Sequence, residues 1–96
     1  MKKINLVWDN SFKKAFKRLN KKNPQLLDKI FRVLEILAEN PFLSSLKSHK
    51  LTGQLEGLWS CSVDYNYRII FAWQQDEISA ESLIILIDIG THDEVY

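Results

Sequence analysis

A run of apolar residues near the end of this 96-residue sequence limits what the chain can fold into more than any other feature. The run is residues 83–89, LIILIDI, and Asp88 is its single polar member. Seven residues are far too few to cross a bilayer, which requires roughly 20. A short, nearly continuous apolar run is typical of a strand that is covered on both faces. We therefore expect residues 83–89 to form a central strand, which the rest of the chain must cover.

Two segments in the first half of the sequence have the apolar spacing of amphipathic helices. The apolar positions are Phe12, Ala15, Phe16 and Leu19 in the first segment, and Leu27, Ile30, Val33 or Leu34, and Leu37 in the second. Asn23-Pro24 separates the two helices, because proline is well tolerated only in the first turn of a helix. Asn40-Pro41 ends the second helix, since the residue before a proline is driven out of the helical region. Each helix thus offers one apolar face to a sheet.

Three further segments have the composition of strands. Residues 3–8 precede the first helix, and residues 58–64 and 67–73 form a hairpin around a turn at residues 65–66. In the first strand of this hairpin, alternation separates two faces, one with Trp59, Cys61 and Val63 and the other with Ser60, Ser62 and Asp64. We expect the face with the tryptophan to lie in the core.

The remaining segments connect these elements. Residues 42–57 link the second helix to the hairpin, and residues 74–82 form a polar turn before the last strand. The predicted fold class is therefore α+β, with the order β-α-α-β-β-β and two N-terminal helices packed on a small antiparallel sheet. Ninety-six residues without a repeat or linker form one domain, residues 1–96.

Charge is unevenly distributed along the chain, although the net charge is only +1. All thirteen Lys and Arg lie in residues 1–68 beside six Asp and Glu, which gives 13 − 6 = +7, whereas residues 69–96 contain six acids and no Lys or Arg. The basic part suits a polyanion, but lysine-rich helix surfaces explain the same distribution. The single cysteine, Cys61, excludes an internal disulfide and indicates a reducing compartment. Because the first residues do not form a signal peptide, we expect a cytoplasmic protein without membrane contact.

Three stretches of sequence carry a resemblance to a known family. They are residues 49–53 (HKLTG) with residues 57–60 (GLWS), residues 67–71 (YRIIF), and residues 86–96 (LIDIGTHDEVY). In this order on a β-α-α-β-β-β framework, they resemble the RelE/ParE superfamily of type II toxins, and within it the YafQ, YoeB and RelE mRNA interferases. The resemblance implies an endoribonuclease without metal or cofactor that cuts mRNA, often in the ribosomal A site. It also implies a co-encoded antitoxin that binds and neutralises the toxin.

Metal-free RNA cleavage requires a general base, a general acid and a group that stabilises charge on the phosphoryl oxygens. Histidine can act as either base or acid near neutral pH, and a guanidinium binds two phosphoryl oxygens without losing its charge. Both histidines of the sequence and the arginine outside the helices lie in the three stretches. The resemblance assigns His92 as general acid, His49 as general base and Arg68 as the stabiliser of transition-state charge. It assigns Tyr96 to contact with the scissile nucleotide, by stacking or through its hydroxyl.

Each of these four residues also has a purely structural interpretation. Either histidine would be unremarkable as a polar residue of a surface loop, and Tyr96 could close an edge of the core. Arg68, alone in a strand, requires an anionic partner, and Asp64 or Glu56 could supply it as a salt bridge instead of a phosphate.

Two sets of basic residues have predicted binding roles. Lys47 and Lys50 flank His49, and we expect them to contact RNA phosphates beside the site. One face of the first helix is basic and is expected to bind an acidic, partly apolar antitoxin segment; it consists of Lys13, Lys14, Lys17, Arg18 and Lys21.

The sequence also departs from the family pattern. Ser60 and Ser62 stand on the strand where RelE has lysines, and Ser62 and Asn66 align with a second histidine and an aspartate of YafQ. Two alternative functions therefore stay open, because fold resemblance alone does not separate them. One is a ParE-type inhibitor of DNA gyrase without catalysis, and the other is an inactive binding partner of the same fold.

Overall fold

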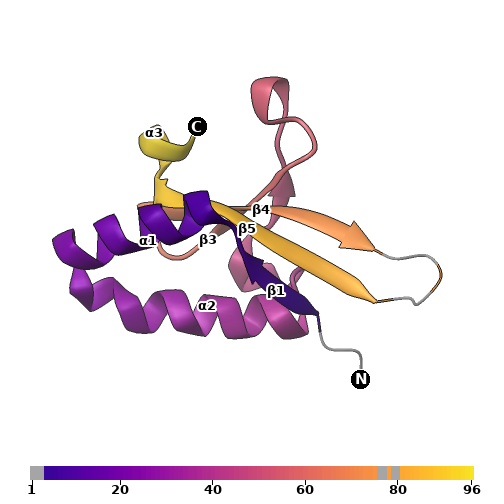
Figure 1. The fold of residues 1–96 in the computed structure, drawn as a ribbon, viewed down its shortest axis with the longest axis horizontal. Helices are drawn as coiled ribbons and strands as arrows, with labels where there is room; N and C mark the ends of the chain where they lie inside the picture. Colours follow the sequence, from indigo (N-terminus) through magenta and orange to yellow (C-terminus); the bar gives the residue numbers. More distant parts are fainter. Residues whose placement is uncertain (1–3, 76–77, 79–80) are drawn as a thin grey trace.

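The fold is built around a five-stranded sheet with the strand order β1-β5-β4-β3-β2. The computed structural model describes residues 4–75, 78 and 81–96. Its strands are β1 (Asn5–Trp8), β2 (His49–Lys50), β3 (Trp59–Ser62), β4 (Tyr67–Gln75) and β5 (Ser82–Thr91). Helices α1 (Asn10–Lys22) and α2 (Leu27–Glu39) lie on one side of the sheet, and the one-turn helix α3 (His92–Val95) lies on the other (Figure 1). Within the described residues, no helix is both long and apolar enough to span a membrane.

Both predicted helices are confirmed, and they end where the sequence signals indicate. Asp9 is the N-cap of α1, and its carboxylate accepts the backbone N–H of Ser11 at 3.1 Å. Pro24 opens a short 3₁₀ turn that leads directly into α2. The backbone N–H of Asn40, the residue before a proline, makes the C-cap hydrogen bond of α2. The α+β class with two N-terminal helices is therefore confirmed.

The sheet departs from the predicted antiparallel arrangement at one edge. β1 pairs with β5 in parallel, with Asn5 opposite Leu83 and Trp8 opposite Leu86. The pairs β3–β4 and β4–β5 are antiparallel, as predicted, and the unpredicted strand β2 also pairs with β3 in the antiparallel direction. A parallel pair requires a long crossover connection, and the chain between β1 and β5 supplies one because it contains both long helices. The prediction of a wholly antiparallel sheet does not hold for β1.

Besides the 3₁₀ turns Ser44–Leu46 and Gly53–Leu55, a short strand and a short helix lie in segments for which the sequence predicts no regular structure. β2 lies inside the expected connection of residues 42–57, and α3 follows the last strand directly. The predicted strands of residues 67–73 and 83–89 are both longer, as β4 and β5. The predicted turn at residues 74–82 falls partly on residues 76, 77, 79 and 80, which lie outside the described residues. The strand β2 and the helix α3 are important for the candidate site, because β2 carries His49 and α3 carries His92.

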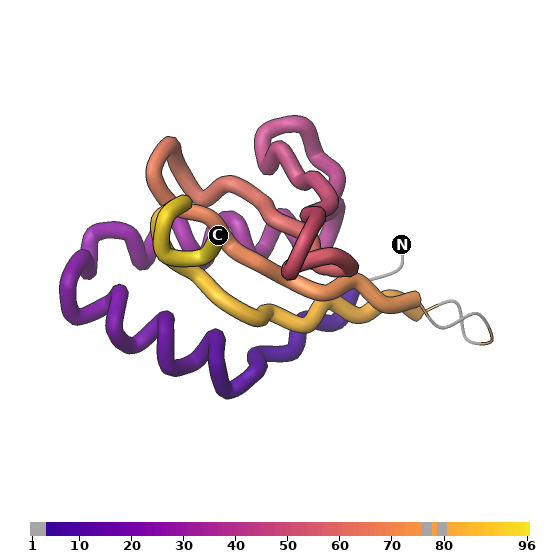
Figure 2. The backbone as a smooth tube through the Cα atoms, turned by 90° about the horizontal axis from the view of Figure 1, so that it is seen from above, coloured from indigo at the N-terminus to yellow at the C-terminus, as the bar shows by residue number. Residues whose placement is uncertain are grey.

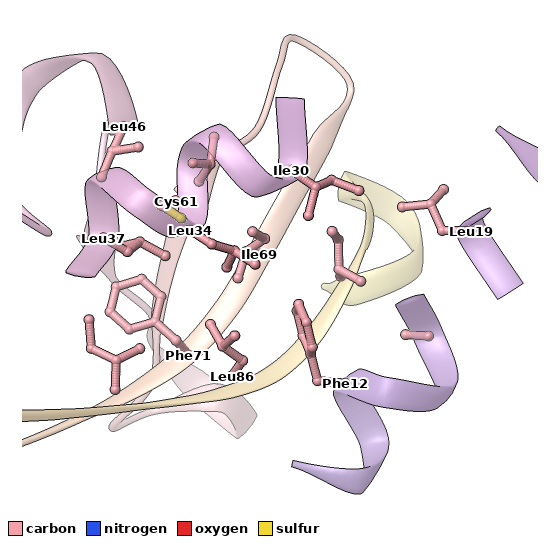
Figure 3. Close-up of a cluster of buried hydrophobic side chains, with 14 of the residues drawn as sticks. Phe12, Leu19, Ile30, Leu34, Leu37, Leu46, Cys61, Ile69, Phe71 and Leu86 are labelled. Atoms are coloured by element: carbon pink, nitrogen blue, oxygen red, sulfur yellow. The ribbon is translucent and has the colours of Figure 1, made fainter. Parts of the chain in front are cut away.

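An apolar core fills the space between the two long helices and the sheet (Figure 3). Phe12 of α1 and Phe71 of β4 are completely buried in it, and such burial stabilises a fold by about 1.5–3 kcal/mol per side chain. Cys61 faces this core, and Trp59 and Val63 pack against it, which confirms the predicted alternation along β3. Burial raises the pKa of the Cys61 thiol to about 12, so the thiol is un-ionised at neutral pH.

Candidate active site

The face of the sheet that points away from α1 and α2 carries polar side chains. Because Cys61 lies in the core, alternation puts Ser60 and Ser62 on the opposite face. His49 is the cross-strand partner of Ser60, and Arg68 is the partner of Ser62. Directly paired residues of neighbouring strands project to the same side of a sheet. His49, Ser60, Ser62 and Arg68 therefore share one surface, which we call the open face.

The guanidinium of Arg68 is held by backbone carbonyls instead of a carboxylate. Its Nη1 donates to the carbonyl oxygens of Asp64 at 2.7 Å, Tyr65 at 3.2 Å and Tyr67 at 3.0 Å. The Asp64 carboxylate is engaged elsewhere, because it accepts the N–H of Tyr67 at 2.9 Å and lies 3.9 Å from Nζ of Lys29. Among the described residues, the predicted structural salt bridge of Arg68 with Asp64 or Glu56 is not formed. The turn fixes the arginine, and no carboxylate of residues 4–75, 78 and 81–96 forms a salt bridge with it.

Arg68 and His92 line the same open hollow on this surface, with a volume of about 450 Å³. The other residues of its lining are Tyr65, Asn66, Tyr67, Thr91 and Asp93. In the view from above, α3 and the turn between β3 and β4 lie at the same end of the molecule (Figure 2). The hollow is formed where the β3–β4 turn meets the start of α3, so two distant segments bring a guanidinium and an imidazole to one surface.

The short helix α3 is fixed at its start by a capping box. The N–H of Glu94 donates to the Thr91 hydroxyl at 3.3 Å, and the N–H of Thr91 donates to the Glu94 carboxylate at 2.9 Å. Hydrogen bonding of the Glu94 carboxylate to the backbone N–H of Thr91, and then to its side chain, holds the pKa of Glu94 below its usual value. Gly90 permits the close packing, because a Cβ at this position would come within 3.2 Å of the Glu94 side chain. The capping box therefore sets the position from which His92 projects.

His92 is exposed and lies against the ring of Tyr96. The two rings are nearly perpendicular, at 87°, with their centroids 4.3 Å apart. Nδ1 of His92 also lies 3.7 Å from a carboxylate oxygen of Asp93. The Tyr96 hydroxyl in turn donates a hydrogen bond to Oγ of Ser60, a completely buried residue of β3. The structure thus joins the predicted site residues His92 and Tyr96 to each other and to the open face.

His49 stands apart from the hollow that Arg68 and His92 share. It is exposed at the edge strand β2, and its cross-strand neighbour Ser60 accepts the hydrogen bond of the Tyr96 hydroxyl. Its Nδ1 lies 3.0 Å from the carbonyl oxygen of Lys47, whose backbone is left-handed with φ 51°. If Nδ1 carries the proton of this hydrogen bond, Nε2 has the free lone pair that a general base requires.

The two lysines predicted to bind RNA lie on different sides of the sheet. Lys47 is exposed and adjoins the open face through its contact with His49. Lys50 is the partner of Trp59 across β2 and β3, and its Nζ lies 5.6 Å from the centre of the Trp59 ring. Lys50 therefore points away from the face of His49, and a phosphate contact beside the site is geometrically easier for Lys47.

The basic residues of α1 are exposed, as expected for a binding surface, but Arg18 differs from the others. Together with Lys22 it lines a second hollow, of about 220 Å³, that also contains the carboxylates of Asp88 and Glu94. Desolvation by burial raises the pKa of Asp88, and the positive charge of Arg18 opposes part of this effect. This second hollow connects the basic helix with the element that carries His92.

Sequence reasoning missed two contributors to the site. The spacing Thr91-x-x-Glu94 is a recognisable capping box and predicts a helix start immediately before His92. Ser60 had no such signal, because its contact with Tyr96 joins residues 36 positions apart. Across the described residues, no group of three or more His, Cys, Asp or Glu side chains is arranged to hold a metal ion.

Comparisons with known proteins agree with this architecture. Structures with the same fold include YafQ from E. coli strain BL21(DE3), with a TM-score of 0.79, 19% identity, and 97% of this chain and 98% of that chain covered. A YoeB/ParE toxin from Agrobacterium tumefaciens has a TM-score of 0.74 and 20% identity over 93% of this chain and 99% of that chain. A chain of the E. coli DinJ-YafQ complex has a TM-score of 0.77 and 18% identity, with 97% and 98% covered.

At the level of sequence, the family comparison is the decisive one. No curated protein sequence is significantly similar to the chain. The sequence profile of the family described as "Bacterial toxin of type II toxin-antitoxin system, YafQ" matches residues 4–96. The match covers almost the whole chain, including β2, the β3–β4 turn and α3. The chain therefore belongs to the YafQ family of bacterial toxins of type II toxin–antitoxin systems.

Proposed function

We propose that the chain is an endoribonuclease that cleaves mRNA, most effectively on the ribosome. The observation that carries this proposal is the shared hollow of Arg68 and His92. In the described part of the chain the Arg68 guanidinium has no carboxylate partner, so it is suited to an anionic ligand. The exposed imidazole of His92, which lines the same hollow, can transfer a proton. The hollow is open to solvent, as access for a polymer requires.

The reaction follows from the roles of these groups. His49 accepts the proton of the ribose 2′-OH, and the 2′-oxygen forms a bond to the adjacent phosphorus. Arg68 stabilises the negative charge on the phosphoryl oxygens. The bond from phosphorus to the 5′-oxygen breaks, and His92 donates a proton to that oxygen as it leaves. The products are a 2′,3′-cyclic phosphate and a 5′-hydroxyl, so no water, metal or cofactor is consumed.

Because His49 lies outside this hollow, the bound RNA must reach both the hollow and β2. Because His49 approaches the site from β2 and His92 from α3, the scissile phosphate would bridge the two elements across Ser60. In-line attack requires the base and the acid on opposite sides of the phosphorus. Lys47, exposed beside His49, would hold a neighbouring phosphate.

We also propose that an antitoxin neutralises the chain through the basic face of α1, in the bacterial cytoplasm where mRNA is translated. A structural relative is a chain of the E. coli DinJ-YafQ complex. The side chains of Lys13, Lys14 and Lys17 are exposed and suit an acidic partner segment. Complex formation should then weaken as salt rises. An affinity that is independent of salt would show that the charges of α1 do not contribute to binding. It would leave the proposal of an antitoxin partner intact.

The direct test is cell-free translation of a defined mRNA with and without the protein, with the RNA ends mapped by primer extension. We expect cuts at codons in the ribosomal A site, and none with a His92→Ala variant. The same mRNA without ribosomes shows whether cleavage depends on translation. Intact mRNA together with inhibition of DNA gyrase would instead establish the ParE-type alternative.

A further inference from the structure

We propose that Ser60 is a positioning residue that acts through Tyr96 on His92. In this arrangement the buried hydroxyl of Ser60 anchors the Tyr96 hydroxyl, and the anchored Tyr96 ring supports the imidazole that donates the proton. The inference rests on the proposed function, because it concerns the geometry of the general acid. It assigns to Tyr96 a structural role in the free protein in place of base stacking.

The first step is the burial of Ser60. Among the described residues it is the one polar side chain in the fully buried class, with 0% exposure. Buried polar groups in native proteins are almost always hydrogen-bonded, since desolvation without a partner is costly. The partner of Ser60 is the Tyr96 hydroxyl, which donates to its Oγ. A polar residue at this position of β3 is therefore explained by the contact with the last turn of the chain.

The second step is the dependence of α3 on external contacts. A helix of four residues is not stable on its own. Its start is fixed by the capping box of Thr91 and Glu94. Val95 is buried, and α3 packs on β4 and β5. The hydrogen bond to Ser60 fixes its end, at Tyr96. Without it, the far end of the turn is free to fray.

The third step is the contact between the two rings. His92 and Tyr96 are four residues apart and lie on the same side of the turn, with ring centroids 4.3 Å apart at 87°. The edge-to-face geometry fixes the plane of one ring relative to the other. Anchoring the Tyr96 hydroxyl therefore restricts the imidazole of His92, although Ser60 is not among the residues that line the hollow.

Two single variants remove opposite ends of the same hydrogen bond. Ser60→Ala removes the acceptor and keeps the Tyr96 ring, and Tyr96→Phe removes the donor and keeps the ring. Because an aromatic ring shifts the resonances of protons above or beside it, the His92 ring protons report the distance to residue 96 by NMR. Ser62→Ala is the matched control for this measurement, since Ser62 lies on the same strand and face.

In RNA-free protein, we expect Ser60→Ala and Tyr96→Phe to move the His92 ring-proton shifts toward those of Tyr96→Ala, and Ser62→Ala to leave them unchanged. In single-turnover cleavage, Ser60→Ala and Tyr96→Phe should each lose roughly 10- to 100-fold in rate at saturating RNA, with little change in KM. The reason is that the general acid is misplaced while RNA binding is retained. The double variant Ser60→Ala/Tyr96→Phe should be no slower than the worse single variant.

Unchanged His92 shifts in both single variants would overturn the proposal, whatever happens to the rate. Rate losses that multiply in the double variant would also overturn it, because the two hydroxyls would then act separately. If Ser60→Ala does not fold, Tyr96→Phe decides the question alone, since its hydroxyl belongs to a residue that is 43% exposed. Absence of cleavage by the wild-type protein would contradict the nuclease, and the NMR comparison would still decide whether Ser60 positions the two rings.

Discussion

The two faces of the sheet carry different kinds of side chain on the same strands. On the side of α1 and α2, Cys61 and Phe71 are completely buried among apolar neighbours. On the open face, Ser60 is hydrogen-bonded to a helix turn and Arg68 is held by three backbone carbonyls. One strand, β3, serves both faces by alternation. The buried core and the proposed chemistry are therefore separated by a single residue step, and substitutions on the two faces should have separable effects.

The largest effect should come from the open face. His92→Ala removes the proposed general acid, and we expect single-turnover cleavage to fall on the order of 10² to 10⁴. Because His92 is exposed and begins a one-turn helix, the melting temperature should stay close to that of the wild type. Rapid-quench kinetics and thermal unfolding of the same preparation measure both quantities. Wild-type cleavage by a folded His92→Ala protein would remove this residue from the mechanism.

The opposite pattern is expected on the core face. Phe71→Ala leaves a cavity beneath α2, and we expect it to lower the free energy of unfolding by about 3–5 kcal/mol. Urea denaturation followed by tryptophan fluorescence measures the loss. Phe42→Ala is a matched control because Phe42 is 53% exposed, so its truncation should cost much less. Equal losses for the two variants would contradict the assignment of Phe71 to the buried core.

Arg68→Lys tests this comparison further, because Arg68 supplies a positive charge and also donates hydrogen bonds to carbonyls of the β3–β4 turn. Lysine keeps the positive charge but loses the planar fork that binds two phosphoryl oxygens. We expect cleavage to fall by roughly 10² to 10³, with a smaller loss of stability from the missing bonds to the turn carbonyls. Equal cleavage by Arg68→Lys and wild type in a single-turnover assay would show that charge alone suffices.

The smallest effect concerns Asp88, which lies in the second hollow. Burial raises its pKa above the ordinary 3.8, so its protonated form favours folding at low pH and this contribution is lost as pH rises through the raised pKa. Asp88→Asn removes the ionised carboxylate, and we expect a small rise in melting temperature at pH 7 that vanishes below about pH 3.8. The exposed Asp93→Asn is the control. A lower melting temperature at pH 7 would mean that attraction to Arg18 outweighs desolvation.

Local sequence signals were sufficient for the helices and for the main strands. Apolar spacing and the two Asn-Pro pairs located α1 and α2, and alternation identified which face of β3 is buried. The parallel pairing of β1 could not be predicted in this way, because the partner of an edge strand depends on tertiary packing. β2 has only two residues and lacks any periodic signal.

For the candidate site, too, the sequence predicted some features and not others. The residue types and motifs pointed to His49, Arg68, His92 and Tyr96, but not to their spatial relations. The bonds of Arg68 to three turn carbonyls and the contact of Tyr96 with Ser60 arise from the folded backbone. Predicting them would require the register of β3 and β4 and the position of α3, which no local pattern contains.

The most direct test of the central claim uses an RNA altered at one atom. A ribosome-bound mRNA is prepared with a normal ribose at the mapped cleavage site, and a second with a 2′-deoxyribose there. The proposed mechanism requires the 2′-oxygen as nucleophile, so the first RNA should be cut to a 2′,3′-cyclic phosphate and a 5′-hydroxyl, and the second should stay intact at that site. Cleavage of the 2′-deoxy RNA at the same position would contradict the mechanism built on His49, Arg68 and His92.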